Sequence, residues 1–306
     1  MAHPHKAHLG RRPGAGEAPR ATEPVRSGGV YVTFTADTEA EARVRIALFA
    51  TCIGDSLFPQ APRATVRVLE RLGHRVLFPV DQVCCGQMHI NTGYLAEALP
   101  VVREHVRTFS PVLTGEWDAI VAPSGSCTGS IRHQQAMVAR RYADEALADD
   151  AQAVASHTYE LSELLVDVLG VTDVGAYFPH RVTYHPTCHS LRMLHVGDKP
   201  VRLLREVEGI QLTELPNAES CCGFGGTFAL KNADTSTAML ADKMAAVKTT
   251  GAEVLTAGDY SCLMHIGGGL SRTRAGVRTM HLAEILAAEK STAPAASDAA
   301  VGQAVR

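Results

Sequence analysis

The sequence predicts an α/β fold made of two duplicated, Rossmann-like parallel-sheet lobes related by a pseudo-twofold axis. The first observation is a repeat of four cysteines. The set Cys52, Cys84, Cys85 and Cys127 recurs as Cys188, Cys221, Cys222 and Cys262, at offsets of 136, 137, 137 and 135 residues. The second is that the flanking segments match, since VRIALFATC corresponds to RVTYHPTC and WDAIVAPSGSC to GAEVLTAGDYSC. Coincident offsets with matching flanks indicate an internal duplication.

The third observation is that strands and helices alternate. Each cysteine or cysteine pair closes an apolar run of strand type, and helical segments lie between these runs. Residues 62–73 place Val66, Leu69 and Leu72 on one face, and residues 200–209 repeat the pattern, each with Pro near the start and Gly at the end. The unit is therefore strand, helix, strand, helix, strand, and this alternation favours a parallel sheet with right-handed crossovers.

A further helix is expected at the end of each lobe. The segment LSELL at 161–165 matches LAEIL at 282–286 at an offset of 121, so the first lobe has about fifteen extra residues. We place them in the helical stretch 132–150. This insertion and the N-terminal segment are candidate docking elements, although a solvated surface helix is the simpler interpretation of the insertion.

The two ends of the chain are rich in Pro, Gly and Ala and poor in large apolar residues. Such composition is typical of segments that do not fold by themselves. We therefore expect a mostly disordered leader over 1–43, a first cysteine-rich lobe over 44–176, a second over 177–288, and a disordered tail over 289–306.

Composition and charge exclude several classes of function. With 46% hydrophobic and 20% charged residues over 306 positions, the chain is of the globular type and can bury a full core. The net charge of −3 leaves no basic field for nucleic acid. Because the sequence contains no run of eighteen apolar residues and no signal-type apolar segment, we expect no membrane span and a cytoplasmic location.

The eight cysteines then need an explanation in a reducing compartment, where structural disulfides are rare. Groups that follow the carboxyl ends of neighbouring parallel strands meet at one sheet edge, so each lobe is expected to gather four thiols, without disulfides. Four thiolates suit zinc or a 4Fe–4S cluster. The Cys-x2-Cys to Cys-x4-Cys knuckles of zinc sites are absent from both sets, and adjacent cysteines favour a cluster with several irons. We therefore predict two iron–sulfur clusters, of the 4Fe–4S type.

Glycines accompany these cysteines. Gly86, Gly223, Gly225 and Gly226 follow the Cys-Cys pairs, and Cys127 lies between Gly125 and Gly129. One interpretation is that the turns aim backbone N–H groups at cluster sulfur, which stabilises its negative charge. The other is that these glycines only permit tight turns between strand and helix.

The doubled pattern of a cysteine, then Cys-Cys-Gly, then a later cysteine resembles the cysteine-rich CCG domain of heterodisulfide reductases and of glycolate oxidase iron–sulfur subunits. The segments FATCIGDSL, CCGQMHINTGY, PSGSCTGSI, YHPTC, CCGFGGTFALK and MHLAEIL, within residues 46–287, are similar to the lactate utilization protein A family. The full CCG pattern ends in Cys-x-x-Cys, whereas Ser130 and His265 stand at the last position here. This departure leaves an ordinary 4Fe–4S cluster and an atypical one equally open.

The resemblance implies an iron–sulfur electron-transfer subunit that works with two further subunits in oxidising L-lactate, or a similar small 2-hydroxy acid, to the 2-oxo acid. The sequence contains no nicotinamide or flavin fingerprint, so the clusters would carry the electrons. A cluster-based thiol–disulfide reductase of the heterodisulfide type is the alternative, and a zinc-binding scaffold is a weaker one. The residues assign no catalytic side chain.

The two sites are expected to be unequal. Alignment by the cysteines places His185 opposite Phe49, His189 opposite Ile53 and His265 opposite Ser130. Histidine can ligate iron, donate to cluster sulfur or carry a proton with an electron. We therefore predict that these three histidines, His265 above all, tune or ligate the second cluster; ordinary packed or surface histidines are the alternative.

Overall fold

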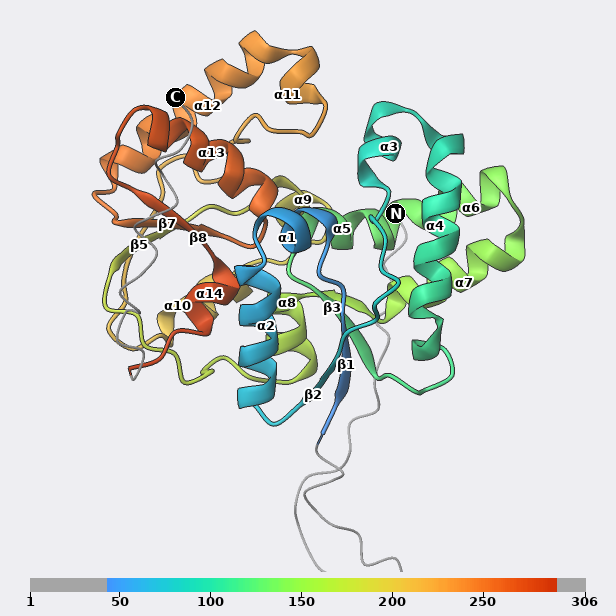
Figure 1. Ribbon diagram of the computed structural model, residues 1–306. Helices are drawn as coiled ribbons and strands as arrows, with labels where there is room; N and C mark the ends of the chain where they lie inside the picture. Colours follow the sequence, from blue (N-terminus) through green and yellow to red (C-terminus); the bar gives the residue numbers. More distant parts are fainter. Residues whose placement is uncertain (1–42, 291–306) are drawn as a thin grey trace, which may run out of the picture. The chain divides into compact units, whose positions relative to one another are not determined.

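The computed structural model describes residues 43–290, and it contains two four-stranded, all-parallel sheets (Figure 1). The predictions of a leader and a tail fall almost entirely outside the described residues. The first sheet has the order β2-β1-β3-β4, formed by β1 (Arg45–Leu48), β2 (Arg75–Leu77), β3 (Ala119–Ala122) and β4 (Thr158–Glu160). The second repeats it as β6-β5-β7-β8, formed by β5 (Arg181–Tyr184), β6 (Gln211–Thr213), β7 (Val254–Ala257) and β8 (Arg278–His281).

The helices of the first half connect and cover its sheet. Helix α2 presents a buried stripe that includes Ala64, Val68 and Leu69, and Gly73, in the left-handed region at φ 86°, follows its end. The helices and helical turns of this half are α1 (Cys52–Leu57), α2 (Gln60–Arg71), α3 (Gln87–Thr92), α4 (Leu95–Phe109), η1 (Ser110–Val112), α5 (Gly125–Ser130), η2 (Ile131–Gln135), α6 (Ala136–Tyr142), α7 (Glu145–Ser156), α8 (Leu161–Glu163) and η3 (Leu164–Val168).

The second half has fewer helices around the same plan. Its long helix α13 continues where the first half breaks into α5, the π-helical turn η2 and α6. The helices of this half are α9 (Cys188–Arg192), α10 (Lys199–Arg205), α11 (Phe228–Lys231), α12 (Ala233–Thr249), α13 (Tyr260–Arg272) and α14 (Leu282–Leu286).

Contacts between the halves come in symmetric pairs, which defines a pseudo-twofold relation. Helix α2 packs on α14 and its equivalent α10 packs on α8, while α1 contacts α13 and α9 contacts α5. The fold class predicted from the sequence, duplicated Rossmann-like lobes, is confirmed. The described residues from Val44 onward form one compact unit, so the lobe boundaries at 176 and 177 stay a prediction.

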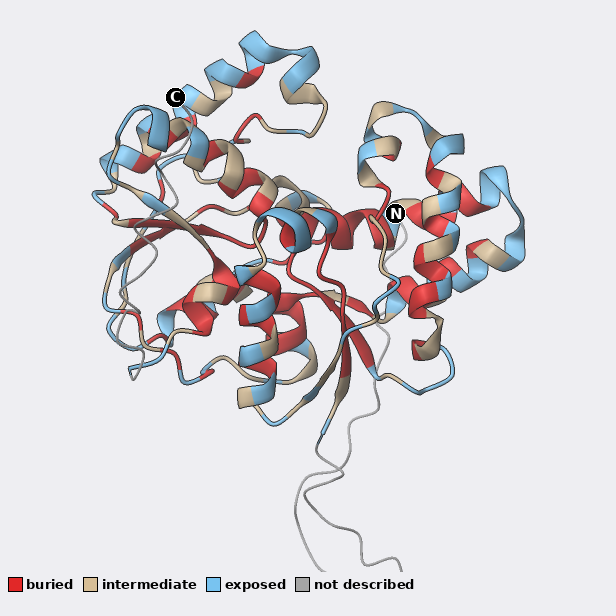
Figure 2. Cartoon of the chain, in the orientation of Figure 1, coloured by how far each residue is buried: buried red, intermediate tan, exposed pale blue. Residues whose placement is uncertain are grey.

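Three apolar cores hold the structure together (Figure 2). One lies between the two sheets and draws on both, with Ile46 and Val121 from the first and Val182 and Val254 from the second, all fully buried. A second core lies under α4, α6 and α7 on the outer face of the first sheet, and a third lies under α13 on the outer face of the second. The fully buried pattern of β3 and β7 is typical of parallel strands covered on both faces.

Two features differ from the sequence-based expectation. Each half has a fourth strand, β4 or β8, directly before the helix that was predicted at its end. The insertion 132–150 does not form a solvated surface helix: α6 and α7 pack on each other and on α4, with Val138, Ala139 and Ala148 fully buried.

Within residues 43–290, no helix combines the length and apolar character needed to cross a bilayer.

Candidate metal centre

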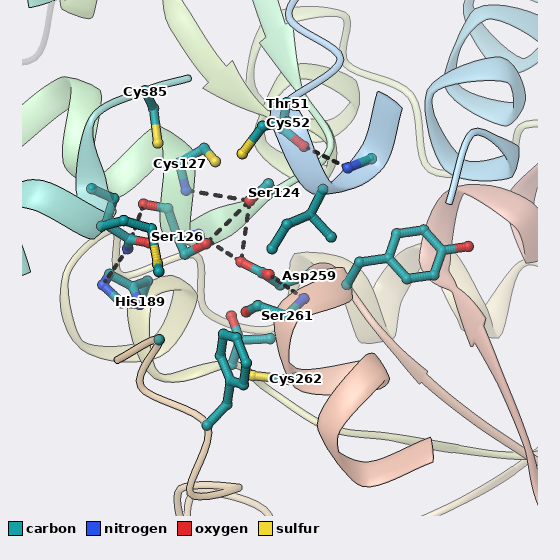
Figure 3. Close-up of a pocket in the computed structure, with 18 of the residues that line it drawn as sticks. Thr51, Cys52, Cys85, Ser124, Ser126, Cys127, His189, Asp259, Ser261 and Cys262 are labelled. Atoms are coloured by element: carbon teal, nitrogen blue, oxygen red, sulfur yellow. Dashed lines mark hydrogen bonds between the residues drawn. The ribbon is translucent and has the colours of Figure 1, made fainter. Parts of the chain in front are cut away.

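All eight cysteines are free thiols, and all eight line one pocket at the carboxyl ends of the strands. Figure 3 shows part of this pocket, with Cys52, Cys85, Cys127 and Cys262 labelled. In each sheet the direction of strand order changes between its two central strands, β1 and β3 or β5 and β7. Ligands of open parallel sheets bind outside such a switch point. Because the two switch points face the same pocket, the fold brings both sets of cysteines to one place.

The first set is placed by three short connections. Cys52 begins α1, directly after Thr51, whose side chain caps the helix by accepting from the Gly54 amide. Thr51 has φ 66° and ψ 151°, a region that only glycine occupies readily, so the backbone is strained beside this cysteine. The Cys52 thiol donates to Cys84 Sγ at 3.7 Å, and Cys127 lies on the first turn of α5.

The second set repeats this arrangement without the strain. Cys188 begins α9 after Thr187, which has an ordinary extended backbone at φ −77°. Cys221 and Cys222 follow β6, and Cys262 lies on the first turn of α13.

Hydrogen bonds between thiols run within each set and follow the same pattern in both. Bonds with Cys52 and then Cys85 lower the pKa of Cys84 well below that of an ordinary thiol. In the second half, bonds with Cys188 and then Cys222 lower the pKa of Cys221 in the same way. Hydrogen bonding from neighbours stabilises a thiolate, so these contacts favour the thiolate form of the first cysteine of each Cys-Cys pair.

Backbone N–H groups point at these two sulfurs. The amide of Gly86 donates to Cys84 Sγ at 3.5 Å, and the amide of Gly223 donates to Cys221 Sγ at 3.4 Å. Both glycines have φ near 90°, which side-chain-bearing residues rarely adopt. The two interpretations of these glycines therefore hold together: the turn requires glycine, and the turn aims an amide at sulfur.

Gly125 and Gly129 have a different role. They lie on α5, and a Cβ added to Gly125 would stand 2.1 Å from Ser190 Oγ of α9. A Cβ on Gly129 would stand 2.8 Å from the sulfur of Met193. These glycines let the helices that follow β3 and β5 approach each other closely across the pseudo-twofold axis.

The three predicted histidines lie in different surroundings. The ring of His185 is fully buried, neither of its nitrogens has a partner among the described residues, and its ligand atom lies within 4.8 Å of Cys222 and Cys262 Sγ. His189 lines the shared pocket, with Nε2 at 3.0 Å from Gln87 Nε2. His265 Nε2 lies 3.4 Å from Ser236 Oγ, and burial lowers its pKa while the nearby Cys221 raises it.

The first set has histidines that alignment of the two halves did not reveal. His105 of α4 is fully buried with both ring nitrogens unpartnered among the described residues, and its ring lies 5.0 Å from Phe49, the residue equivalent to His185. Burial lowers the pKa of His105 to about 3, and the charge of Cys84 acts against this. His89 of α3 also contributes to the low pKa of Cys84 through its charge. His89 lies in the segment CCGQMHINTGY, which resembles the family, but alignment of the two halves does not single it out, and His105 lies on α4, outside the matched segments.

A buried carboxylate joins the halves at the centre of the pocket. Asp259 caps α13 by accepting from the Ser261 amide at 2.9 Å, and it also accepts from the Ser126 amide at 2.8 Å and the Ser124 hydroxyl at 3.2 Å (Figure 3). Ser124 is its equivalent in the first half, where it caps α5 at Cys127 N. The alignment of SGSC with GDYSC carries this equivalence, but only the fold shows that the two caps meet.

The chemistry of the residues present fits metal or iron–sulfur binding. Each set offers four thiols and one backbone N–H aimed at sulfur, and His185 adds a buried imidazole within 4.8 Å of two sulfurs of the second set. Soft thiolate donors with N–H groups directed at sulfur are the environment that such clusters use.

Comparison with known proteins defines the class first. The model of the CCG family, described as a cysteine-rich domain, matches residues 46–132 and 182–267, one match in each half of the chain. A glutamate racemase from Bacillus anthracis is similar in structure at a TM-score of 0.31 and 12% identity, over 80% of this chain and 79% of that chain. A likeness at this level bears on neither function nor site.

Relatives then define the particular family. Lactate utilization protein A of Bacillus velezensis is 44% identical over 243 residues, which cover 79% of this chain and 99% of the relative. The proteins of the same name from Bacillus subtilis and Geobacillus kaustophilus are 43% and 41% identical, with 79% of this chain covered in each case and 99% and 98% of the relatives. The chain belongs to the lactate utilization protein A family.

Proposed function

We propose that this chain is the iron–sulfur electron-transfer subunit of a system that oxidises L-lactate, or a similar 2-hydroxy acid, to the 2-oxo acid. The observation that carries the proposal is the pair of symmetric four-thiol sets that face one pocket. The name of the relatives, lactate utilization protein A, supports the substrate class. Oxidation of a 2-hydroxy acid releases two electrons and two protons, so two one-electron carriers in one chain match its stoichiometry.

In this proposal, one cluster is held by Cys52, Cys84, Cys85 and Cys127 and the other by Cys188, Cys221, Cys222 and Cys262, and when bound they supply one-electron transfer. The amides of Gly86 and Gly223 stabilise negative charge on their sulfurs. Asp259 and its partners hold the two cysteine sets at a fixed separation. The lactate-oxidising chemistry belongs to two further subunits. This chain exchanges electrons with them, as donor or as acceptor.

The first test is the iron content of single-cysteine variants. Protein purified without oxygen is expected to be brown and to contain iron and sulfide, whereas a zinc-binding scaffold is colourless. Cys85→Ser and Cys222→Ser should each lose about half of the iron and one of two electron paramagnetic resonance (EPR) signals, because each removes one ligand from a four-thiol set. Ser56→Ala, beside the pocket but outside the sets, is the control. Loss of all the iron in either variant would contradict two separate clusters.

The disulfide-reductase alternative is favoured by one observation, that a single pocket exposes both thiol sets. A disulfide bound there would take up two electrons and two protons and leave as two thiols. Two assays distinguish the two functions. One measures electron transfer from lactate with the partner subunits present, and the other measures reduction of disulfides by a chemical reductant. Turnover of disulfides with the chemical reductant, without electron transfer from lactate through the partner subunits, would overturn the lactate proposal.

A further inference from the structure

Two cations accompany the second cysteine set. Lys243 of α12 is only 1% exposed, and its ammonium donates to the carbonyl oxygens of Asn217 at 2.8 Å and Ala218 at 3.1 Å. These carbonyls belong to the segment that leads into Cys221 and Cys222. A buried lysine is rare unless its charge is compensated, so the compensating groups need to be identified.

Burial lowers the pKa of Lys243, and all four cysteines of the second set act against this. Lys243 and Cys221 also line one pocket beside α12. Besides burial, the positive charge of Lys243 lowers the pKa of His185. A ring nitrogen of His185 lies within 4.8 Å of Cys222 Sγ and Cys262 Sγ. Within residues 43–290, no carboxylate oxygen lies within 4.0 Å of the Lys243 ammonium.

Arg192, at the end of α9, is the second cation. Its Nη1 lies 3.9 Å from Cys188 Sγ, and its Nη2 donates to the carbonyl oxygen of Glu219 at 3.0 Å. This guanidinium is exposed, so solvent and salt weaken its action on the site.

The first cysteine set lacks both charges. Alignment by the cysteines places Ser56 opposite Arg192. In the helix that covers the first site, His105 follows Cys85 by 20 residues, much as Lys243 follows Cys222 by 21. His105 contacts Phe49 as Lys243 acts on the equivalent His185, and the His105 imidazole is buried and neutral. The helix of the first half that corresponds to α12 in chain order, α4, therefore carries a buried neutral ring at nearly the same offset from the cysteine pair.

We propose that Lys243, assisted by Arg192, gives the cluster of the second set a higher reduction potential than that of the first, so that electrons within the chain move from the first site to the second. The inference rests on the proposed function. One-electron reduction adds negative charge to a thiolate cluster, and a nearby cation in a medium of low dielectric stabilises that charge. Lys243 and Arg192 tune the site and take no part in bond making.

The test is an EPR-monitored redox titration of the reconstituted chain, with dithionite as electron donor. The wild type should show two midpoint potentials, and the signal that Cys188→Ser alters should have the higher one. Lys243→Met and Lys243→Gln should move this potential down toward the other and leave the first signal unchanged. Lys243→Arg, which keeps the positive charge, should keep the higher potential of the second signal. A purely structural role of Lys243 gives no reason for the potential to follow the charge.

Arg192→Ser reproduces the residue of the first half at an exposed position, so it is expected to fold. It should lower the second potential by less than Lys243→Met does, and the difference should fade at high salt. If Lys243→Met and Lys243→Gln do not retain iron, this variant and the wild-type potentials decide the question. His105→Met is the matched control and should leave the second potential unchanged.

Two outcomes separate this inference from the proposal beneath it. A chain that binds two clusters of equal potential, or whose higher potential belongs to the first set, overturns the role of Lys243 and Arg192 alone. A chain that binds no iron after anaerobic reconstitution overturns the proposed function and this inference with it.

Discussion

Glu160 and His281 occupy equivalent positions in the two halves, yet they make the stability of the fold depend on pH in opposite ways. Each is a buried N-cap with a capping box, at the start of α8 or α14. Burial raises the pKa of Glu160 to about 7 and lowers the pKa of His281 to about 4. Because both groups prefer to be neutral, ionisation of either one destabilises the folded chain.

For Glu160 the pKa is higher in the folded chain than the ordinary value of 4.5, so its contribution is complete below pH 4.5 and is lost as the pH rises through 7. We expect Glu160→Gln to remove a decline in the free energy of unfolding of roughly 3 kcal/mol between pH 5 and 8. For His281, whose folded pKa is lower than 6.5, stability is lost as the pH falls toward 4, and His281→Gln should remove that acid limb. Urea titrations across pH 4–8 measure both; an unchanged pH profile in Glu160→Gln would disprove the assignment.

The sequence predicts the eight cysteines as one functional group because a repeat marks them, and the structure brings them to one pocket; no pattern in the sequence predicts the neighbours Asp259, Lys243 and His105. Asp259 stands at a recognisable position before Cys262, but its bonds to Ser124 and Ser126 cross between halves. Lys243 and His105 lie on α12 and α4, whose sequences match too weakly to align. The structure relates the two helices through the contact of His105 with Phe49 and the effect of the Lys243 charge on His185, the residue equivalent to Phe49.

At the scale of elements, the close approach of α5 and α9 depends on the absence of a side chain at Gly125. We expect Gly125→Ala to destabilise the chain by roughly 1–3 kcal/mol, because its Cβ would stand 2.1 Å from Ser190 Oγ and the helices would have to separate. Gly268→Ala is the matched control, since this glycine lies inside α13 with no atom within 4 Å of an added Cβ. It should stabilise by about 0.5–1 kcal/mol. Thermal or urea unfolding of both variants compares them, and equal signs would contradict the packing argument.

Element prediction failed at the fourth strand of each sheet for a physical reason. β4 and β8 are short and contain polar residues, TYE and RTMH, so neither has the apolar run that marked the other strands. Their pairing with β3 and β7 comes from position at the sheet edge rather than from composition. The helices that follow them were detectable because their apolar residues face the core between the sheets.

At the scale of the whole molecule, Asp259 connects the two halves at the pocket. We expect Asp259→Ala to lower the free energy of unfolding by roughly 2–4 kcal/mol, since it removes the buried carboxylate that accepts hydrogen bonds from Ser124, Ser126 and Ser261. Asp144→Ala removes an exposed N-cap that bonds only to the Leu147 amide, and should cost about 1 kcal/mol. Urea denaturation measures both. Equal losses would mean that Asp259 acts only as a helix cap.

The apolar layer between the two sheets belongs to neither half, because it takes Ile46 and Val121 from one and Val182 and Val254 from the other. A chain with one copy of the repeat would leave that layer bare, so it would be stable only as a pair of identical chains. A symmetric pair must carry two identical sites. A single chain that holds both halves is free of that constraint, so Lys243 can lie beside one set of thiols while the corresponding helix of the other half carries His105.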